Sequence, residues 1–256
     1  MTTLTSKFVW FDYVVQDVAK ATGFLGELFN WKTQEIPFGG GVTYAMLNAD
    51  GEGIGGILKT PPGAPPEAHW LSHLRVADAK AASEKIVKLG GKILKPAAKQ
   101  GEFGTMAIVA DSLGGPFALW EPTKPTEEAG DFKGKPGHWV WNELYTADVS
   151  TSVAFYTAFS NFTEETMAMK DGNYHILNAG GKSRAGVMKS PMPMPQAWLP
   201  YVQVASVDDT VAKAKKLGAT IHMAGEDVPG VGRIAIFSDT QGGMLGLLQP
   251  SPDPKG

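Results

Sequence analysis

The side chains that could do chemistry in this chain are few, because it has no cysteine and only five histidines. Thiolate nucleophiles, disulfides, cysteine-based zinc sites and iron–sulfur clusters are therefore excluded. No phosphate-binding glycine loop and no Gly-x-Ser-x-Gly nucleophile motif is present. A metal site would have to combine carboxylates with histidines, which are His69, His73, His138, His175 and His222.

Two carboxylates, Asp12 and Glu143, stand among aromatic and aliphatic residues. A carboxylate in apolar surroundings costs free energy unless it is paired. Each acid is therefore predicted either as a ligand-facing acid or general base, or as a structural carboxylate that pairs with Arg75 or accepts backbone N–H bonds. Both interpretations stay open at this point.

The elements that must position these acids are duplicated, because the second half of the sequence repeats the first. The matches keep their order along the chain. Trp10, Asp12, Asn30, Asn48, Gly56, Pro61, Trp70, Leu89, Asp111 and Gly114 correspond to Trp141, Glu143, Asn161, Asn178, Gly186, Pro191, Trp198, Leu217, Asp239 and Gly242. Asp12 and Glu143 thus occupy equivalent positions of two duplicates.

Each half repeats again, more faintly, as a strand, a helix and three further strands. Asp17 and Asp78 are predicted to cap helices that follow alternating strands. The apolar spacing predicts helices over 79–89 and 207–217, each ended by glycine. Short strands are expected over 43–48, 55–59, 105–110 and 116–120.

The composition is that of a folded chain with 256 residues, 43% hydrophobic, 19% charged and a net charge of −3. This balance argues against disorder and against a nucleic-acid surface. No apolar run is long enough to span a membrane, and the first residues do not resemble a signal peptide. We therefore expect a cytoplasmic protein.

A polar segment rich in proline and glycine separates the two halves. It predicts a first domain over 1–122, a linker over 123–137 and a second domain over 138–256. The sequence leaves open whether the chain is a monomer or a homodimer.

The repeated unit resembles the vicinal oxygen chelate superfamily, which includes glyoxalase I, extradiol dioxygenases and bleomycin-binding proteins. Tandem glyoxalase-like proteins look most similar. The resemblance rests on the segments 141–144, 148, 198–202 and 239–243, and on their counterparts in the first half. It implies an α+β fold of four strand–helix–three-strand units in two tandem domains, each a curved mixed sheet around a cavity with helices outside.

Metal-dependent members of this superfamily hold a divalent Zn, Ni, Mn or Fe ion with three side chains. The first ligand lies seven residues before the aspartate that opens the helix. The second lies on the equivalent strand of the next unit, and the third is a glutamate on the last strand. The positions that match here are Trp10, Leu71 and Ala118 in the first half and Trp141, Leu199 and Gly246 in the second. None of these side chains binds a divalent cation. The resemblance therefore predicts the fold without its usual metal site and without a cofactor.

If Trp10 and Leu71 point into the cavity, as the resemblance implies, residues two positions away share that face. Asp12 and His73 then lie on it, and Glu121 points the other way. His73 is either a hydrogen-bonded wall residue or the acid–base partner of Asp12. The predicted ligand-binding residues are Trp10, Arg75, Trp120, Trp141, Tyr201 and Gln203, and the candidate catalytic residues are Asp12, His73 and Glu143.

Three functions remain open. The first is a metal-free protein that binds a small, planar or apolar metabolite in aromatic cavities. The second is a glyoxalase-like lyase or a dioxygenase with a displaced metal site near Asp12 and His73. The third is a scaffold whose cavities are filled by tryptophan and whose surface binds a protein.

Overall fold

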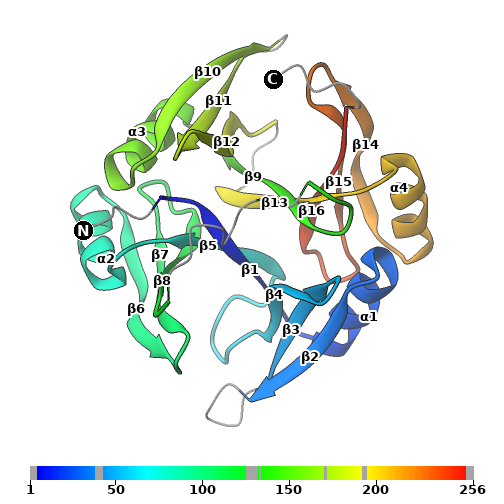
Figure 1. The fold of residues 1–256 in the computed structure, drawn as a ribbon, viewed down its shortest axis with the longest axis horizontal. Coiled ribbons are helices and arrows are strands. Elements are labelled where there is room, and N and C mark those ends of the chain that lie inside the picture. The colour runs from blue at the N-terminus through cyan, green and yellow to red at the C-terminus, as the bar shows by residue number, and fades with distance from the viewer. Residues whose placement is uncertain are drawn as a thin grey trace. The chain divides into compact units, whose positions relative to one another are not determined.

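Each half of the chain contributes the strands of one eight-stranded mixed sheet in the computed structural model, which describes residues 5–37, 43–124, 132, 134–169, 172–191 and 195–251. The first half has the order β2-β3-β4-β1-β5-β8-β7-β6 and the second half β10-β11-β12-β9-β13-β16-β15-β14 (Figure 1). Of the predicted linker, residues 125–131 and 133 lie outside the described residues, so the division into domains stays a prediction.

The elements of the first half are β1 (Phe8–Val15), α1 (Val18–Phe29), β2 (Lys32–Pro37), β3 (Thr43–Ala49), β4 (Glu52–Lys59), β5 (His69–Arg75), α2 (Ala79–Lys88), β6 (Lys92–Gln100), β7 (Gly104–Ala110) and β8 (Pro116–Pro122). Those of the second half are β9 (Trp139–Thr146), α3 (Val149–Phe159), β10 (Thr163–Met169), β11 (Gly172–Ala179), β12 (Lys182–Lys189), β13 (Ala197–Gln203), α4 (Val207–Lys216), β14 (Thr220–Val228), β15 (Gly232–Ser238) and β16 (Met244–Pro250). The order strand, helix, three strands therefore occurs four times, as predicted.

Within each repeat, neighbouring strands among the three after the helix are antiparallel. The last of these three strands pairs in parallel with the first strand of the repeat. β4 pairs with β1 in this way, as do β8 with β5, β12 with β9 and β16 with β13. This pairing places the fourth strand of a repeat directly beside the strand that carries the candidate site residues.

The predicted helix boundaries are confirmed. The carboxylates of Asp17 and Asp78 accept hydrogen bonds from the backbone N–H groups of Lys20 and Ala81. Such N-cap bonds satisfy amide groups that have no partner inside the helix. α2 ends before Gly90, whose φ of +89° favours glycine.

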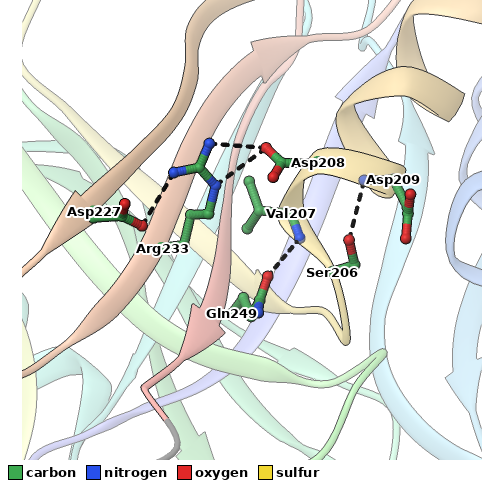
Figure 2. Close-up of polar contacts among 7 residues, drawn as sticks. All are labelled: Ser206, Val207, Asp208, Asp209, Asp227, Arg233 and Gln249. Atoms are coloured by element: carbon green, nitrogen blue, oxygen red, sulfur yellow. Dashed lines mark hydrogen bonds and ion pairs between the residues drawn. The ribbon is translucent and has the colours of Figure 1, made fainter.

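The helix α4 begins at a polar cluster shown in Figure 2. The Ser206 hydroxyl caps the helix through the Asp209 N–H, and the Gln249 side chain accepts from the Val207 N–H. Nearby, Arg233 donates to Asp208 and to Asp227. Both hydrogen bonds raise the pKa of the Arg233 guanidinium, so it stays charged and links β14 and β15 to the helix.

The packing divides the chain into two compact units. The first unit consists of Met1–Trp10, Leu71–Asp131 and Trp141–Leu199, and the second of Phe11–Trp70, Phe132–Val140 and Pro200–Gly256. Among the described residues, no helix is both long and apolar enough to pass through a bilayer.

Each unit has its own aromatic core. In the first unit, Trp198 lies between Phe8, at 4.6 Å between ring centroids, and Tyr156 of α3, at 5.2 Å. In the second unit, Trp139 contacts Phe11, Trp31 and Trp70 at 4.6, 5.2 and 5.3 Å. Burying aromatic rings of this size stabilises each unit strongly.

The turn between β7 and β8 anchors a buried network in the first unit. One oxygen of Asp111, Oδ1, accepts from the backbone N–H groups of Leu113 and Gly115. The other, Oδ2, accepts from the hydroxyl of Tyr156 and the amide of Gln196. Four donors thus depend on one carboxylate that is 3% exposed.

Candidate functional site

A buried carboxylate and a tyrosine meet on neighbouring strands of the first repeat. The Tyr44 hydroxyl of β3 donates to Asp12 Oδ1 of β1 over 2.6 Å. Asp12 is 5% exposed, so the hydrogen bond offsets part of the cost of burying its carboxylate. The register explains the meeting, because Asp12 faces Gly56 of β4 and Gly56 faces Met46 of β3, two residues from Tyr44.

The third repeat contains the equivalent pair. The Tyr174 hydroxyl of β11 donates to Glu143 Oε1 of β9 over 2.7 Å. Here the indole N–H of Trp141 also donates to the Tyr174 oxygen over 2.7 Å. Glu143 is buried, whereas Trp141 and Tyr174 are half-buried.

A glycine makes room for each tyrosine. A Cβ on Gly56 would lie 2.0 Å from the Tyr44 hydroxyl oxygen, and a Cβ on Gly186 would lie 1.8 Å from that of Tyr174. Both distances are far below van der Waals contact, so any larger residue would displace the tyrosine. The same arrangement therefore occurs twice: a tyrosine beside a glycine, with its hydroxyl against a carboxylate. The residues are Tyr44 with Gly56 and Tyr174 with Gly186.

The electrostatics keep Tyr174 protonated. Burial and the negative charge of Glu143 raise the pKa of the Tyr174 hydroxyl well above its usual value. The phenol is therefore neutral at physiological pH and remains a hydrogen-bond donor.

His73 lies in an apolar part of the first unit. It pairs with Ala118 of β8, and its ring centroid is 6.5 Å from that of Trp120. Leu71 and Ala118 belong to one hydrophobic cluster with Met106, against which Trp120 packs. Asp12 belongs to the second unit, so the predicted acid–base pairing of Asp12 with His73 stays a prediction.

The structure gives Arg75 a structural contact. Its guanidinium donates from Nε and Nη2 to the carbonyl of Thr5, over 3.1 and 2.8 Å, and its backbone N–H donates to Lys7. The equivalent Gln203 is also buried, and its backbone N–H donates to His138. A part for Arg75 or Gln203 in ligand binding stays a prediction.

Tyr201 lies where the second half differs from the first. It pairs with Gly246 of β16, and a Cβ on Gly246 would lie 2.3 Å from Cδ1 of the tyrosine ring. The first half has His73 beside Ala118 at the same place. The glycine thus accommodates the larger ring, and contact of Tyr201 with a ligand stays a prediction.

The tryptophans fall into two groups by exposure. Those predicted to face a cavity, Trp10, Trp120 and Trp141, are half-buried. The remaining ones, Trp31, Trp70, Trp139 and Trp198, are buried at 7% exposure or less. Trp198 packs against Tyr156 of α3, and Glu121, predicted to point away from the cavity, accepts from the Ala79 N–H at the start of α2. Contact of Trp10, Trp120 and Trp141 with a ligand stays a prediction.

The donor set does not fit a metal ion at the positions that the resemblance assigns to metal ligands. Alkyl side chains and glycine offer no lone pair, and an indole N–H is a donor only. Trp141 already uses its N–H on Tyr174. Within the described ranges, no three histidine, aspartate or glutamate side chains form a group that could hold a metal ion. The displaced metal site near Asp12 and His73 stays a prediction.

One histidine prediction is wrong. The sequence predicts His138, His175 and His222 at the surface or the rim, but His138 is 2% exposed and lies on the segment whose carbonyl accepts from the Gln203 N–H. His222 is exposed, and its Nε2 lies 2.9 Å from the Ser238 hydroxyl. His175 lies on β11, with Nδ1 2.8 Å from Glu164 Oε1.

Replacing Glu164 by glutamine is expected to destabilise the protein at neutral pH and to matter less as the pH falls. Hydrogen bonds from Thr166 and His175 lower the pKa of Glu164 in the folded protein. The ionised group therefore contributes stability above its ordinary pKa of 4.5, and this contribution is lost as the pH falls through the lower folded value. Chemical denaturation of both proteins across the acid range measures it. A wild-type advantage that grows toward acid would contradict the assignment.

The sequence reasoning missed Tyr44 and Tyr174. A signal was present, since Tyr44 and Tyr174 are spaced like Asn48 and Asn178, which the repeat had already matched. What the sequence did not contain was the strand register that brings each hydroxyl to its acid.

Comparisons with known proteins agree with this fold and repeat. A model of the Glyoxalase/Bleomycin resistance protein/Dioxygenase superfamily matches residues 7–119. A Mycobacterium tuberculosis protein named glyoxylase CFP32 is 34% identical over 248 residues, which cover 95% of this chain and 94% of that protein. The anthracycline biosynthesis protein DauV of Streptomyces sp. is 26% identical, covering 94% and 92%. The chain therefore belongs to the Glyoxalase/Bleomycin resistance protein/Dioxygenase superfamily.

Solved structures confirm the α+β fold of curved mixed sheets. The Mn(II)-bound glyoxalase from Novosphingobium aromaticivorans matches 96% of this chain and 83% of its own with a TM-score of 0.65 and 15% identity. The trihydroxybiphenyl dioxygenase from Sphingomonas wittichii matches 97% and 93% with a TM-score of 0.65 and 14% identity. At these identities the likeness concerns the fold.

Proposed function

We propose that this chain is a glyoxalase-like protein that binds a small planar or apolar metabolite without a metal ion. The observation that carries the proposal is the repeated pair of a buried carboxylate and a tyrosine, Asp12 with Tyr44 and Glu143 with Tyr174. Both duplicates keep the pair although a buried carboxylate costs free energy, which favours a function for it. We assign one ligand site to each half of the duplication.

The half-buried tryptophans support a planar ligand. Indole faces stack on flat molecules, and sites for small molecules combine such apolar walls with a few polar groups. Trp141 is both a half-buried ring and a hydrogen-bond neighbour of the Glu143 pair. One relative's name refers to anthracycline biosynthesis. Polycyclic aromatic compounds therefore belong among the first candidates.

Native mass spectrometry of freshly isolated protein tests the proposal. We expect a small organic molecule on part of the population, and quenching of tryptophan fluorescence when planar aromatic compounds are added. Glu143→Gln should weaken this binding, whereas the matched change Glu165→Gln on the exposed face of β10 should leave it unchanged. Wild-type protein that carries no organic molecule and responds to no compound of the panel would contradict ligand binding.

A further inference from the structure

The two duplicates differ at a place where the first half buries a cation. Arg75 of β5 is 2% exposed, and its guanidinium donates from Nε and Nη2 to the Thr5 carbonyl over 3.1 and 2.8 Å. The Arg75 backbone N–H donates to the Lys7 carbonyl over 2.9 Å, which fixes the strand beside the segment that contains Thr5. The guanidinium is therefore held against a backbone carbonyl of the neighbouring segment.

The second half keeps this backbone arrangement but has a shorter, uncharged side chain in place of the arginine. The positions that match Thr5, Lys7 and Arg75 in the repeat are Pro136, His138 and Gln203. The Gln203 backbone N–H donates to the His138 carbonyl over 2.8 Å, as Arg75 does to Lys7. Gln203 is 8% exposed. Its side chain therefore starts from the same place on the backbone as that of Arg75.

Two polar atoms of the second half are buried without partners. Among the described residues, neither Gln203 Oε1 nor His138 Nε2 has a hydrogen-bond partner. His138 Nδ1 lies 3.4 Å from the Pro136 carbonyl oxygen. Because a carbonyl oxygen can only accept, the neutral imidazole carries its proton on Nδ1 and leaves Nε2 as an acceptor. Both unsatisfied atoms therefore offer lone pairs.

The repeat brings these acceptors to one place, which we call the Gln203 site: Gln203 Oε1, His138 Nε2 and the Pro136 carbonyl. Since Arg75 reaches the carbonyl of Thr5, the matching side chain of Gln203 is directed toward the carbonyl of Pro136, which His138 also faces. Burying unsatisfied acceptors costs free energy. Pro136 is exposed, so the site borders the surface.

We propose that the Gln203 site binds the guanidinium group of a small molecule, at the place that Arg75 fills with its own guanidinium in the first half. A guanidinium has five N–H donors on arginine and no acceptor, so it complements a group of lone pairs. Hydrogen bonds from a charged donor are also stronger than those from a neutral one. No residue of this site belongs to the carboxylate–tyrosine pairs, so the proposal does not depend on the proposed function.

Three probes separate donor groups from charge and shape. Methylguanidinium has both the charge and the donors, methylurea has nearly the same planar shape without the charge, and tetramethylammonium has the charge without N–H donors. NMR of isotope-labelled histidine follows the Nε2 signal of His138, assigned through His138→Gln. We expect methylguanidinium to shift this signal saturably and to bind at least about tenfold more tightly than the other two probes.

Gln203→Arg supplies the guanidinium from the chain itself, as Arg75 does in the first half. We expect it to abolish methylguanidinium binding and to raise the midpoint of thermal unfolding above that of Gln34→Arg, the same change on the exposed edge strand β2. If Gln203→Arg does not fold, Gln203→Met serves, because it removes the acceptor and keeps a similar length. It should weaken methylguanidinium binding about tenfold without lowering the unfolding midpoint.

A His138 signal that does not respond to methylguanidinium in the wild-type protein would overturn the proposal. Methylurea or tetramethylammonium binding as tightly as methylguanidinium would overturn it as well. So would undiminished methylguanidinium binding by Gln203→Arg or Gln203→Met, or an unfolding midpoint that is lowered in both of these variants.

Discussion

Replacing Asp111 by alanine is expected to lower the free energy of unfolding by about 3–4 kcal/mol. The carboxylate accepts from Leu113, Gly115, Tyr156 and Gln196, and it is buried in the first unit. Alanine would leave these donors without their acceptor, and the bonds lost by the Gly115 N–H and the Tyr156 hydroxyl are buried, where an unsatisfied group costs the most. Urea denaturation followed by circular dichroism measures the change.

The control is Asp78→Ala, which removes one exposed N-cap bond at the start of α2. Its expected cost is smaller, about 0.5–2 kcal/mol. Equal losses in the two variants would show that the network around Asp111 adds no stability beyond an ordinary cap.

Replacing Gly186 by alanine is expected to disrupt the Glu143 site directly. The new methyl group would lie 1.8 Å from the Tyr174 hydroxyl oxygen and 3.0 Å from the Trp141 indole nitrogen, so the tyrosine must leave its acid. We expect a loss of about 1–3 kcal/mol in stability from overpacking. We also expect roughly tenfold weaker binding of a planar aromatic probe such as naphthol, because the carboxylate loses the partner that orients it.

Gly23→Ala provides the matched control, because the added methyl group would meet no atom within 4 Å apart from its own stretch of α1. Alanine at this helical position should stabilise the protein slightly and leave naphthol binding unchanged. Naphthol bound equally by Gly186→Ala and the wild type would mean that the position of Tyr174 has no part in the site.

The sequence predicted the fold well because the fold is repeated. In the repeat, Asp12 matches Glu143 and Asp111 matches Asp239, and these matches located equivalent strands and turns. Asp17 and Asp78 marked the starts of two helices, which the structure confirms. When both halves of the sequence show the same pattern, they predict the positions of the strands better than one half alone.

The sequence pattern did not predict the edge strands β2 and β6. Nearly all their residues are exposed, so apolar and polar side chains do not alternate along them. Their pairing with β3 and β7 depends on backbone hydrogen bonds, which the side-chain pattern does not encode.

The site was predicted in part. The acids Asp12 and Glu143 were found because a carboxylate is conspicuous among apolar residues. Their tyrosine partners were not, because a tyrosine in a strand is ordinary and its partner depends on register. Arg75 was offered as a partner for Asp12, and its contact with the Thr5 carbonyl follows from the path of the N-terminal segment, which side-chain pattern does not reveal.

Under the proposed function, the chain binds its ligand without a divalent metal ion. Electron paramagnetic resonance of Mn(II) titrated with the full chain tests it most directly, because the signal of free Mn(II) is lost when the ion is bound. We predict that the wild-type protein leaves this signal undiminished. Stoichiometric loss of the signal, restored by Asp12→Asn or Glu143→Gln, would contradict the account.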